Sequence, residues 1–429
     1  MTKWRVTRRV GTAAVMFLLV GLVAGSPLAS ADSGRQDHRG DHGSDAIYVA
    51  PPGSSHGSGR RCRHAEFTTI STAVAAAPSD GTVVVCPGTY KEDVFVNKSL
   101  NLLGRDATID ATGLENGVWV VASNVRVDGF TIENANGEGV LAGVDALTDA
   151  GQLPAAGPVL SDVTVSNNEV INNDKGFNGT ESGNCKYPGD CGGGIHFNGT
   201  THSTMQGNTV TGNSDGVLLT DDYAPSSYNV IDGNVVNDNL SECGIVLPSH
   251  ASNAVTFDPT TFQVTAVNPT LGGVYGNIVR DNIADGNGTN KAPPQFGGGG
   301  SGSGIGLFGS GPGSAVYNNV VVDNEASGNG LAGITIHAHH PGGEDIDGNV
   351  FVHNKLGTNN TGGDGFDGPP TMDFQTTGIA VFSVVPAHMV IAHNKIRDNA
   401  IGIWLSTVIT ADGLDTNHFR NVTTPIVTG

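Results

Sequence analysis

The chain has 429 residues, 38% of them hydrophobic, and a formal net charge of −20 from 21 Lys and Arg against 41 Asp and Glu. An acidic surface of this strength repels nucleic acid and anionic membranes, so neither is expected as a partner. A polyanionic sugar is repelled as well unless a bound cation or a local basic patch intervenes.

The first residues predict export. Four of the first nine residues are basic, an apolar run follows from Ala13 to Ala24, and Ala29-Ser30-Ala31 supplies an A-x-A cleavage site. This pattern is typical of a secretory signal peptide, residues 1–31, that is cleaved after Ala31, so the protein is expected to be secreted. The pair Arg8-Arg9 leaves both the general and the twin-arginine export routes open.

Residues 32–45 are rich in His, Gly and Asp and have no apolar periodicity, so they are expected to form a disordered linker. Residues 46–429 are expected to form one domain. No later stretch contains 18 consecutive apolar residues, so no membrane span is expected.

The five cysteines of an exported chain favour disulfide bonds. Cys62 and Cys86 flank the first helix-like segment and form one predicted pair. Cys185 and Cys191 close a short loop before a strand and form the second. Cys243 is left over, and the alternatives for it are a small buried residue or a reactive thiol.

A short helix is predicted near the start of the domain. Phe67, Ile70, Val74 and Ala77 follow each other at helical spacing, and Pro78 ends the segment. An amphipathic helix at this place would cap the open end of a stack of strands and cover an edge that otherwise promotes aggregation.

From Thr82 onward, short β-branched runs alternate with Gly and Asn turns, and none has the length or period of a helix. After residue 165, pairs of Asn five residues apart recur seven times. The pairs are Asn168 and Asn173, Asn208 and Asn213, Asn234 and Asn239, Asn277 and Asn282, Asn319 and Asn324, Asn349 and Asn354, and Asn394 and Asn399. Such a repeat predicts stacked turns in which Asn tolerates the left-handed conformation and its amides hydrogen-bond from one coil to the next.

A strand that begins with Gly follows most Asn pairs. The aligned glycines are Gly194, Gly216, Gly244, Gly304, Gly333, Gly378 and Gly402. The shortest intervals between them are 22 and 24 residues, which sets the length of one coil. Apolar residues stand one and three places after each Gly, and because side chains alternate along a strand, these two columns are predicted to form the core.

The segment GTVVVCPGTYKEDVFVNKSLNLLG, residues 81–104, resembles the first coil of secreted β-helix proteins of the pectin-lyase-like superfamily. The Asn repeat resembles the β-helix repeats of that superfamily and of related periplasmic copper-maturation proteins. The resemblance covers about residues 46–425. It implies an all-β fold, a single-stranded right-handed parallel β-helix with an N-terminal capping helix, and we expect a monomer. Its motifs are structural, so they imply the fold more directly than the function.

Three insertions interrupt the repeat, at residues 251–272, 284–303 and 355–377. Long loops on one side of a solenoid tend to mark the functional side. Reactive residues are therefore expected at the outward positions of the Gly strands, from which these loops leave.

Asp222 and His250 each stand six places after the aligned Gly of neighbouring coils, which are about 4.8 Å apart. They are predicted to exchange protons with a substrate, with Asp221 as acid, base or cation ligand and Tyr223 as a further catalytic residue. His337 and His339 would neutralise a carboxylate or bind sugar. Predicted substrate contacts are His196, Phe308, Phe382 and Trp404. In the alternative, these Asp and His residues only end turns and the aromatic residues stack on each other.

The favoured reaction is β-elimination or epimerisation of a uronate in an extracellular polysaccharide, in which a base removes the C5 proton. Pectate lyases of the resembled superfamily use Arg or Lys with calcium on this face, and the aligned strands contain neither. Members that resemble alginate epimerases and lyases use His, Tyr and Asp, the roles that His250, Tyr223 and Asp222 would take.

Two other functions stay open. Asp221 and Asp222 followed by His250 resemble the polygalacturonase pattern of an inverting hydrolase, but the other motifs of that family are absent. A non-enzymatic solenoid that binds glycan or metal is the third, because the run of histidines at 337, 339 and 340 with His250 suits copper or zinc. Calcium on Asp221, Asp222 or Glu242 is a possible cofactor. The sequence identifies neither the sugar nor the bond.

Overall fold

The computed structural model describes residues 46–52, 59–143, 159–174, 193–250, 255–257, 264–267, 272–291, 300–309, 311, 313–339, 344–363 and 375–429. Contacts divide the chain into residues 1–42 and 43–429, and all described residues belong to the second unit. The expected signal peptide and linker, the predicted pair Cys185 and Cys191, and His340 lie outside the described residues.

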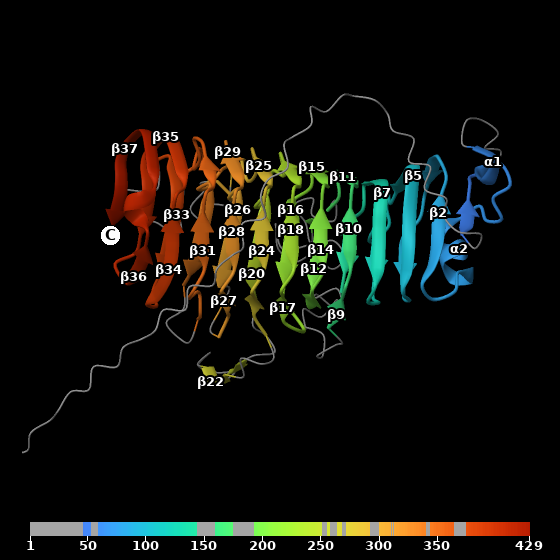
Figure 1. Cartoon of the computed structure of the whole chain (residues 1–429), viewed down its shortest axis with the longest axis horizontal. Coiled ribbons are helices and arrows are strands. Elements are labelled where there is room, and N and C mark those ends of the chain that lie inside the picture. Colours follow the sequence, from blue (N-terminus) through green and yellow to red (C-terminus); the bar gives the residue numbers. More distant parts are fainter. Residues whose placement is uncertain are drawn as a thin grey trace, which may run out of the picture. The chain divides into compact units, whose positions relative to one another are not determined.

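The described chain winds as stacked coils, from blue at one end to red at the other in Figure 1. It is a right-handed parallel β-helix, as predicted. Each full coil contributes a strand to each of three parallel columns, which we call the first, second and third sheets. β5 (Leu100–Asp110), β7 (Val125–Glu133), β35 (Lys395–Leu405) and β37 (His418–Thr428) are long enough to belong to two sheets or to run the length of a coil.

The first sheet contains the Gly strands. In stacking order they are β4 (Val94–Val96), β6 (Val118–Val120), β8 (Val140–Ala142), β12 (Gly193–Asn198), β16 (Asp215–Thr220), β20 (Ile245–Ser249), β26 (Ile305–Gly309), β30 (Ile334–Ala338), β33 (Thr377–Ser383), β35 and β37.

The second sheet begins at the N-terminal end of the stack and follows the same order of coils. Its strands are β1 (Ile47–Val49), β2 (Gly81–Val85), β5, β7, β10 (Thr164–Ser166), β14 (Thr204–Gln206), β18 (Val230–Asp232), β24 (Ile278–Arg280), β28 (Val320–Val322), β31 (Val350–Val352), β34 (Ala387–Ala392) and β36 (Ile409–Asp412).

Within each coil, the strand of the third sheet follows the strand of the second sheet after a short turn. Its strands are β3 (Gly88–Tyr90), β5, β7, β11 (Glu169–Ile171), β15 (Thr209–Thr211), β19 (Val235–Asn237), β25 (Ile283–Asp285), β29 (Glu325–Ser327), β32 (Lys355–Leu356), β35 and β37.

A short side sheet joins β9 (Leu160–Ser161), β13 (Thr200–Thr201), β17 (Ser226–Ser227), β23 (Val274–Tyr275) and β27 (Val316–Tyr317). The strands β21 (Val255–Phe257) and β22 (Val264–Val267) form an antiparallel pair within the first predicted insertion. A 3-10 turn, η2 (Leu414–Thr416), precedes β37.

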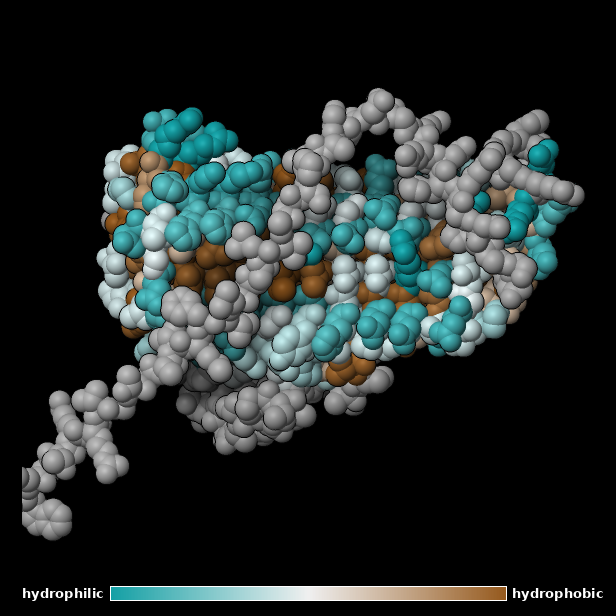
Figure 2. All heavy atoms as spheres, in the orientation of Figure 1, coloured by the Kyte–Doolittle hydropathy of each residue, from teal (hydrophilic) through white to brown (hydrophobic). Residues whose placement is uncertain are grey.

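The two predicted core columns are confirmed. The residues one and three places after the aligned glycines, from Ile195 and Phe197 to Ile403 and Leu405, are all buried in one continuous core. Alternate residues face outward, and Figure 2 shows polar surface interrupted by apolar strips on the face in view.

The glycine column has a steric cause. A Cβ on Gly216 would lie 2.2 Å from the carbonyl oxygen of Gly244, and the same contact recurs between each Gly and the next coil, at distances up to 3.0 Å for Gly333. Real Cβ atoms do not come this close, so the coils can stack only if these positions lack a side chain. The column also includes Gly117 and Gly139, which the sequence alignment had left out.

Stacked Asn amides connect the coils, as predicted, but in a different register. One ladder joins Asn168, Asn208, Asn234, Asn282, Asn324, Asn354, Asn394 and Asn417. A second joins Asn173, Asn213, Asn239, Asn287, Asn329, Asn359 and Asn399. A third joins Asn229, Asn277, Asn319 and Asn349.

The predicted pairing was therefore wrong at Asn277, Asn319 and Asn349, which belong to the third ladder. The predicted turn role was also wrong in detail. The left-handed residue is the one that precedes the ladder Asn, such as Asn167 at φ 54° or Gly207 at φ 62°. This turn directs the following amide into the stack, where it bonds to both neighbouring coils.

The capping helix is confirmed, with a later start than expected. α2 spans Ile70–Ala76, and Ile70, Ala73 and Val74 are buried against the first coils. Phe67 lies outside the helix because it pairs with Val49 in a β-bridge. Glu92 holds the helix N-terminus by accepting hydrogen bonds from the backbone N–H groups of Ile70 at 2.7 Å and Ser71 at 2.8 Å.

Cys62, at the end of the short helix α1 (Gly59–Cys62), forms the predicted disulfide with Cys86. Cys243 is a free thiol and is buried, as in the first of the two alternatives. No helix among the described residues has the length and apolar character needed to cross a membrane.

Candidate active site

The candidate site lies where strands of the first sheet end and the chain turns outward. β16 and β20 pair in parallel with Leu218 opposite Val246, which sets the residues that follow these strands side by side. Asp222 follows β16 and His250 follows β20. The ring nitrogen Nδ1 of His250 is hydrogen-bonded to Oδ1 of Asp222. The sequence spacing thus predicted a pair that the structure brings into direct contact.

Asp222 is buried, and both of its carboxylate oxygens accept hydrogen bonds. Oδ2 accepts from Nδ2 of Asn198 at 2.8 Å and from Oγ1 of Thr220 at 2.7 Å. Burial favours the neutral acid, but the charge and hydrogen bond of His250 outweigh it and lower the pKa of Asp222 below its usual value, with a smaller contribution from His196. Asp222 is therefore an ionised acceptor at neutral pH.

Asp221 has a different environment from its neighbour. Its carboxylate accepts from the backbone N–H of His250 and the hydroxyl of Ser249, each at 2.8 Å, and from the backbone N–H of Gly273. Burial raises the pKa of Asp221, and the charge of Asp222 adds to the rise against the opposing charge of His250. Asp221 thus holds the backbone that carries His250, and its side chain does not reach the surface.

A row of buried polar groups leads from Asp222 back into the molecule. Oγ1 of Thr220 lies 2.8 Å from Nε2 of His196, and Nδ1 of His196 lies 3.0 Å from Oε1 of Glu138. The row crosses from β8 through β12 and β16 to the end of β20 and ends at His250. The His250 side chain is 24% exposed, whereas that of Asp222 is 2% exposed. His250 is therefore the member of the row that can meet a ligand.

A second group on the same sheet contains the other predicted histidines. Phe308, His337 and Phe382 occupy matching outward positions of β26, β30 and β33. The rings of Phe308 and His337 are 3.9 Å apart between centroids, and His339 lies 5.1 Å from Phe382. Nδ1 of His337 and Nε2 of His339 are 2.5 Å apart. All four side chains are partly exposed.

Like Asp221 and Asp222, the predicted site residues Trp404 and Tyr223 are buried. Trp404 is 2% exposed, because the terminal strand β37 stacks on its coil with Val427 opposite Trp404 and Phe382 stacks on its other side. Tyr223 is 1% exposed, and its hydroxyl donates to the carbonyl oxygen of Asn198 at 2.8 Å. Its ring packs over Gly199, where any Cβ would lie 2.6 Å from the ring. Tyr223 is placed to support Asn198.

His196 is also buried, so a direct contact with substrate would require the surface to open. Sequence reasoning missed its partners Glu138 and Thr220, and it missed Asn198. The available signal was position: Asn198 and Thr220 stand four places after the aligned Gly, and Glu138 directly precedes Gly139, a glycine that had not been aligned.

The donor set does not suit a cation at Asp221 and Asp222. Each of their four oxygens already accepts an N–H or O–H hydrogen bond. Within the described part of the chain, no three His, Cys, Asp or Glu side chains form a group that could hold a metal ion. Glu242 instead lies near the Cys243 thiol, whose pKa is raised first by burial and then by the Glu242 charge.

A family model for the right-handed β-helix region matches residues 116–274. No curated protein matches the sequence. Among solved structures, pectate lyase Pel9A superimposes with a TM-score of 0.50 at 15% identity, covering 87% of this chain and 78% of that one. The chain has a right-handed parallel β-helix fold.

Two further solved structures have slightly lower TM-scores. An alginate lyase from Paenibacillus sp. str. FPU-7 has a TM-score of 0.48 at 11% identity, covering 82% of this chain and 95% of that one. The A-module of the mannuronan C-5 epimerase AlgE4 from Azotobacter vinelandii has a TM-score of 0.48 at 13% identity, covering 83% and 91%. Identities this low concern the fold alone.

Proposed function

We propose that this protein is a carbohydrate-active enzyme that removes the C5 proton of a uronate residue in an extracellular polysaccharide, as a lyase or an epimerase. The observation that carries the proposal is the contact between Asp222 and His250. An ionised, buried carboxylate holds a partly exposed imidazole by Nδ1 at the rim of the first sheet. The Cys62–Cys86 disulfide supports the extracellular location, because such bonds persist in oxidising compartments.

The pairing supports a separate role for each ring nitrogen. An ionised Asp222 only accepts hydrogen bonds, so Nδ1 of His250 carries a proton and Nε2 is the basic nitrogen of the neutral ring. Nε2 takes the C5 proton of the bound uronate, and Asp222 stabilises the imidazolium that results. In a lyase, the C5–H electrons then form the C4=C5 double bond and the C4–O bond breaks, so the departing sugar oxygen must receive a proton. In an epimerase, a proton returns to C5 from the opposite face.

The developing negative charge needs neutral or positive groups near the uronate carboxylate. We assign this role to His337 and His339, which share the sheet with His250 and are partly exposed, with Phe308 and Phe382 as apolar contacts for sugar rings. Substrate contact by His196 and Trp404 and a catalytic role for Tyr223 stay predictions of the sequence alone.

The geometry supports a hydrolase less well. Inverting hydrolysis requires two carboxyl groups on opposite sides of the bond, roughly 6.5 to 9.5 Å apart, that reach the substrate and a water. Asp221 and Asp222 are adjacent and buried, and their oxygens are engaged by protein donors.

The test is incubation of the mature protein, with and without calcium, against pectin, alginate, hyaluronan, chondroitin and neutral glycans. A lyase releases products whose C4=C5 bond absorbs in the ultraviolet, and an epimerase changes the C5 configuration seen by NMR of the recovered polymer. His250→Ala should lower either activity at least 100-fold, since general bases typically contribute that much or more. His388→Ala is the matched control, because exposed His388 also pairs with an aspartate, Asp412, at 3.3 Å.

Reducing ends without ultraviolet absorbance would replace the proposal with a hydrolase. No change in any glycan would leave a binding solenoid, and full activity of the His250→Ala variant would exclude the proposed base. Dependence of activity on calcium would require a cation site other than the two aspartates.

A further inference from the structure

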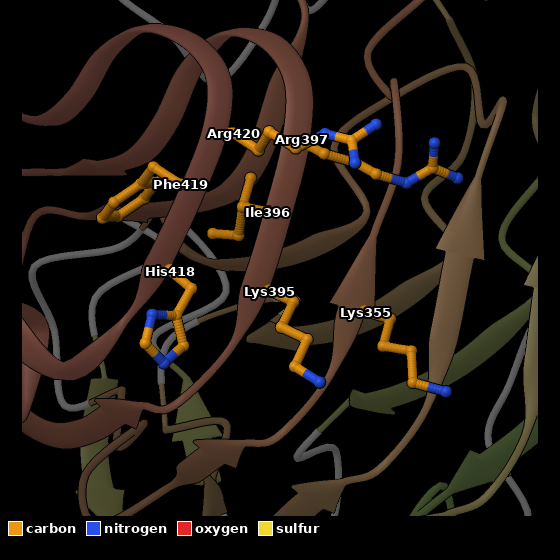
Figure 3. A pocket seen from close by; sticks show the side chains of 7 residues that line it. All are labelled: Lys355, Lys395, Ile396, Arg397, His418, Phe419 and Arg420. Carbon is orange, nitrogen blue, oxygen red and sulfur yellow. The ribbon is translucent and has the colours of Figure 1, made fainter.

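A basic hollow lies on the C-terminal coils, away from the candidate active site. Its cavity of about 330 Å³ is lined by Lys355, Lys395, Ile396, Arg397, His418, Phe419 and Arg420. These residues belong to β32, β35 and β37 in the third sheet, whereas Asp222 and His250 follow strands of the first. Figure 3 shows the two lysines side by side and the two arginines projecting together to the same side.

The strand register places the positively charged side chains next to each other. Lys355 is opposite Lys395, and Arg397 is opposite Arg420, so each pair is separated by one step between neighbouring strands, about 4.8 Å. Between these outward residues, Ile396 is opposite Phe419. Ile396 is buried, while Phe419 is partly exposed and gives the hollow an apolar surface beside its cations.

This concentration of cations is local. The matching outward positions of the preceding coils hold acidic, polar or aliphatic residues, namely Glu169 and Ile171, Thr209 and Thr211, Val235 and Asn237, Ile283 and Asp285, and Glu325 and Ser327. In a chain with 41 acidic and 21 basic residues, four cations on three successive strands form an exception to the acidic surface.

Half of these cations are already paired. Lys355 contacts Glu325 at 2.6 Å, and Arg397 contacts Asp398 at 3.3 Å. Lys395 and Arg420 are exposed and form no ion pair with another described residue at this range. These two side chains are therefore available to an external anion.

We propose that the basic hollow binds a polysaccharide that carries carboxylates, at a surface separate from Asp222 and His250. Cations spread over three strands suit an extended chain of spaced charges, and the Phe419 ring offers contact to the apolar face of a sugar. A nucleic acid has a denser charge and would be repelled by the acidic surface around the hollow. The inference goes beyond the proposed function and does not depend on catalysis.

The test measures binding rather than turnover. Polygalacturonate and alginate are titrated at low and high salt onto the His250→Ala protein, with dextran as the neutral glycan and single-stranded DNA as the competing polyanion. The double variant Lys395→Ala/Arg420→Ala is compared with Arg126→Ala/Arg280→Ala, which removes the same charge from two exposed arginines paired to Asp128 and Asp232. The melting temperature of each variant establishes that it is folded.

The hollow variant should bind the polyuronates about five- to twenty-fold more weakly at low salt, because each exposed charge contact contributes a factor of about two to five. The control pair should change binding less than twofold, and high salt should reduce the difference. Equal binding by both variants, equal binding of dextran, or tighter binding of DNA than of either polyuronate would overturn the proposal. An inactive enzyme that still binds through the hollow would refute only the proposed function.

Discussion

Glu138 and His196 are 58 residues apart in the sequence, yet Oε1 and Nδ1 lie 3.0 Å apart in the interior. The hydrogen bonds of the row determine how many protons this pair holds. Thr220 gives its only hydroxyl proton to ionised Asp222, so Nε2 of His196 must donate to Thr220. The contact between Nδ1 and Glu138 then needs a second proton. The pair is therefore uncharged overall, either as carboxylate with imidazolium or as acid with imidazole.

Substitutions of Glu138 should show whether His196 requires a hydrogen-bond partner or a negative charge at this position. Glu138→Gln can still donate to Nδ1 of a neutral His196, so we expect its melting temperature to stay close to that of the wild type. Glu138→Ala leaves a buried ring nitrogen without this partner and should cost about 1–3 kcal/mol. Thermal unfolding followed by circular dichroism measures both. The exposed Glu66→Ala variant is the control, and equal losses for Gln and Ala would argue that the carboxylate charge itself is required.

The two adjacent aspartates should affect stability in opposite directions with pH. The lowered pKa of Asp222 means that its ionised form stabilises the fold above the ordinary Asp pKa of about 3.9, and that this contribution is lost as the pH falls through the lower folded value. The destabilisation caused by Asp222→Asn should therefore shrink in acid. The pKa of Asp221 is raised in the folded protein, so ionisation of Asp221 destabilises the fold as the pH rises through the folded pKa. The stability of the Asp221→Asn variant should therefore increase relative to that of the wild type over this rise in pH.

Melting temperatures of the wild type and both variants between about pH 3 and about pH 8 test this pair of trends. Parallel curves for all three proteins would show that neither carboxyl changes its pKa on folding.

The glycine column should tolerate no side chain. Gly216→Ala places a Cβ 2.2 Å from the Gly244 carbonyl oxygen and 2.3 Å from Val236. Coils would have to separate locally, which we expect to cost about 1–3 kcal/mol. Gly311→Ala is the control, because nothing lies within 4 Å of its added Cβ. Chemical denaturation of the two variants compares them, and an equally stable Gly216→Ala protein would disprove the steric explanation of the column.

Removing one ladder amide should weaken two coil junctions. The Asn234 side chain donates to Met205 at 3.0 Å and to Asn282 at 2.9 Å, and it accepts from Asn208. Asn234→Ala leaves these buried groups without partners and should cost about 2–5 kcal/mol, several times the effect of exposed Asn97→Ala. Hydrogen exchange should show faster amide exchange in β14 and β24, which flank the altered coil, than in β6. Uniform protection would contradict a local effect.

The sequence predicted those features that depend on spacing within one strand. The aligned glycines and the inward columns follow from the alternation of side chains, and the contact of Asp222 with His250 follows from counting six places from two glycines. The register of the Asn ladders could not be predicted in the same way. Asn277, Asn282 and Asn287 are each five residues apart, so a pair does not reveal which two of the three ladders it joins.

The burial of a side chain was harder to predict from the sequence than the face of the strand from which it projects. Trp404 points outward as its position requires, but the strand that stacks on its coil removes it from the surface. The row behind His250 was missed for a related reason, because the positions of Glu138 and Thr220 relative to their glycines do not distinguish them from other residues on the outward face. Their importance arises only when three coils are stacked and Glu138, His196 and Thr220 meet.

Along the Asn ladders, two residues are neighbours in space whatever number of residues separates them in the sequence. Successive members of the first ladder are 40, 26, 48, 42, 30, 40 and 23 residues apart, yet each junction has the same amide contact. A loop can therefore be lengthened, shortened or exchanged between coils without shifting which strands touch. Such a scaffold lets evolution, or a protein engineer, graft new recognition loops onto a fixed row of reactive side chains.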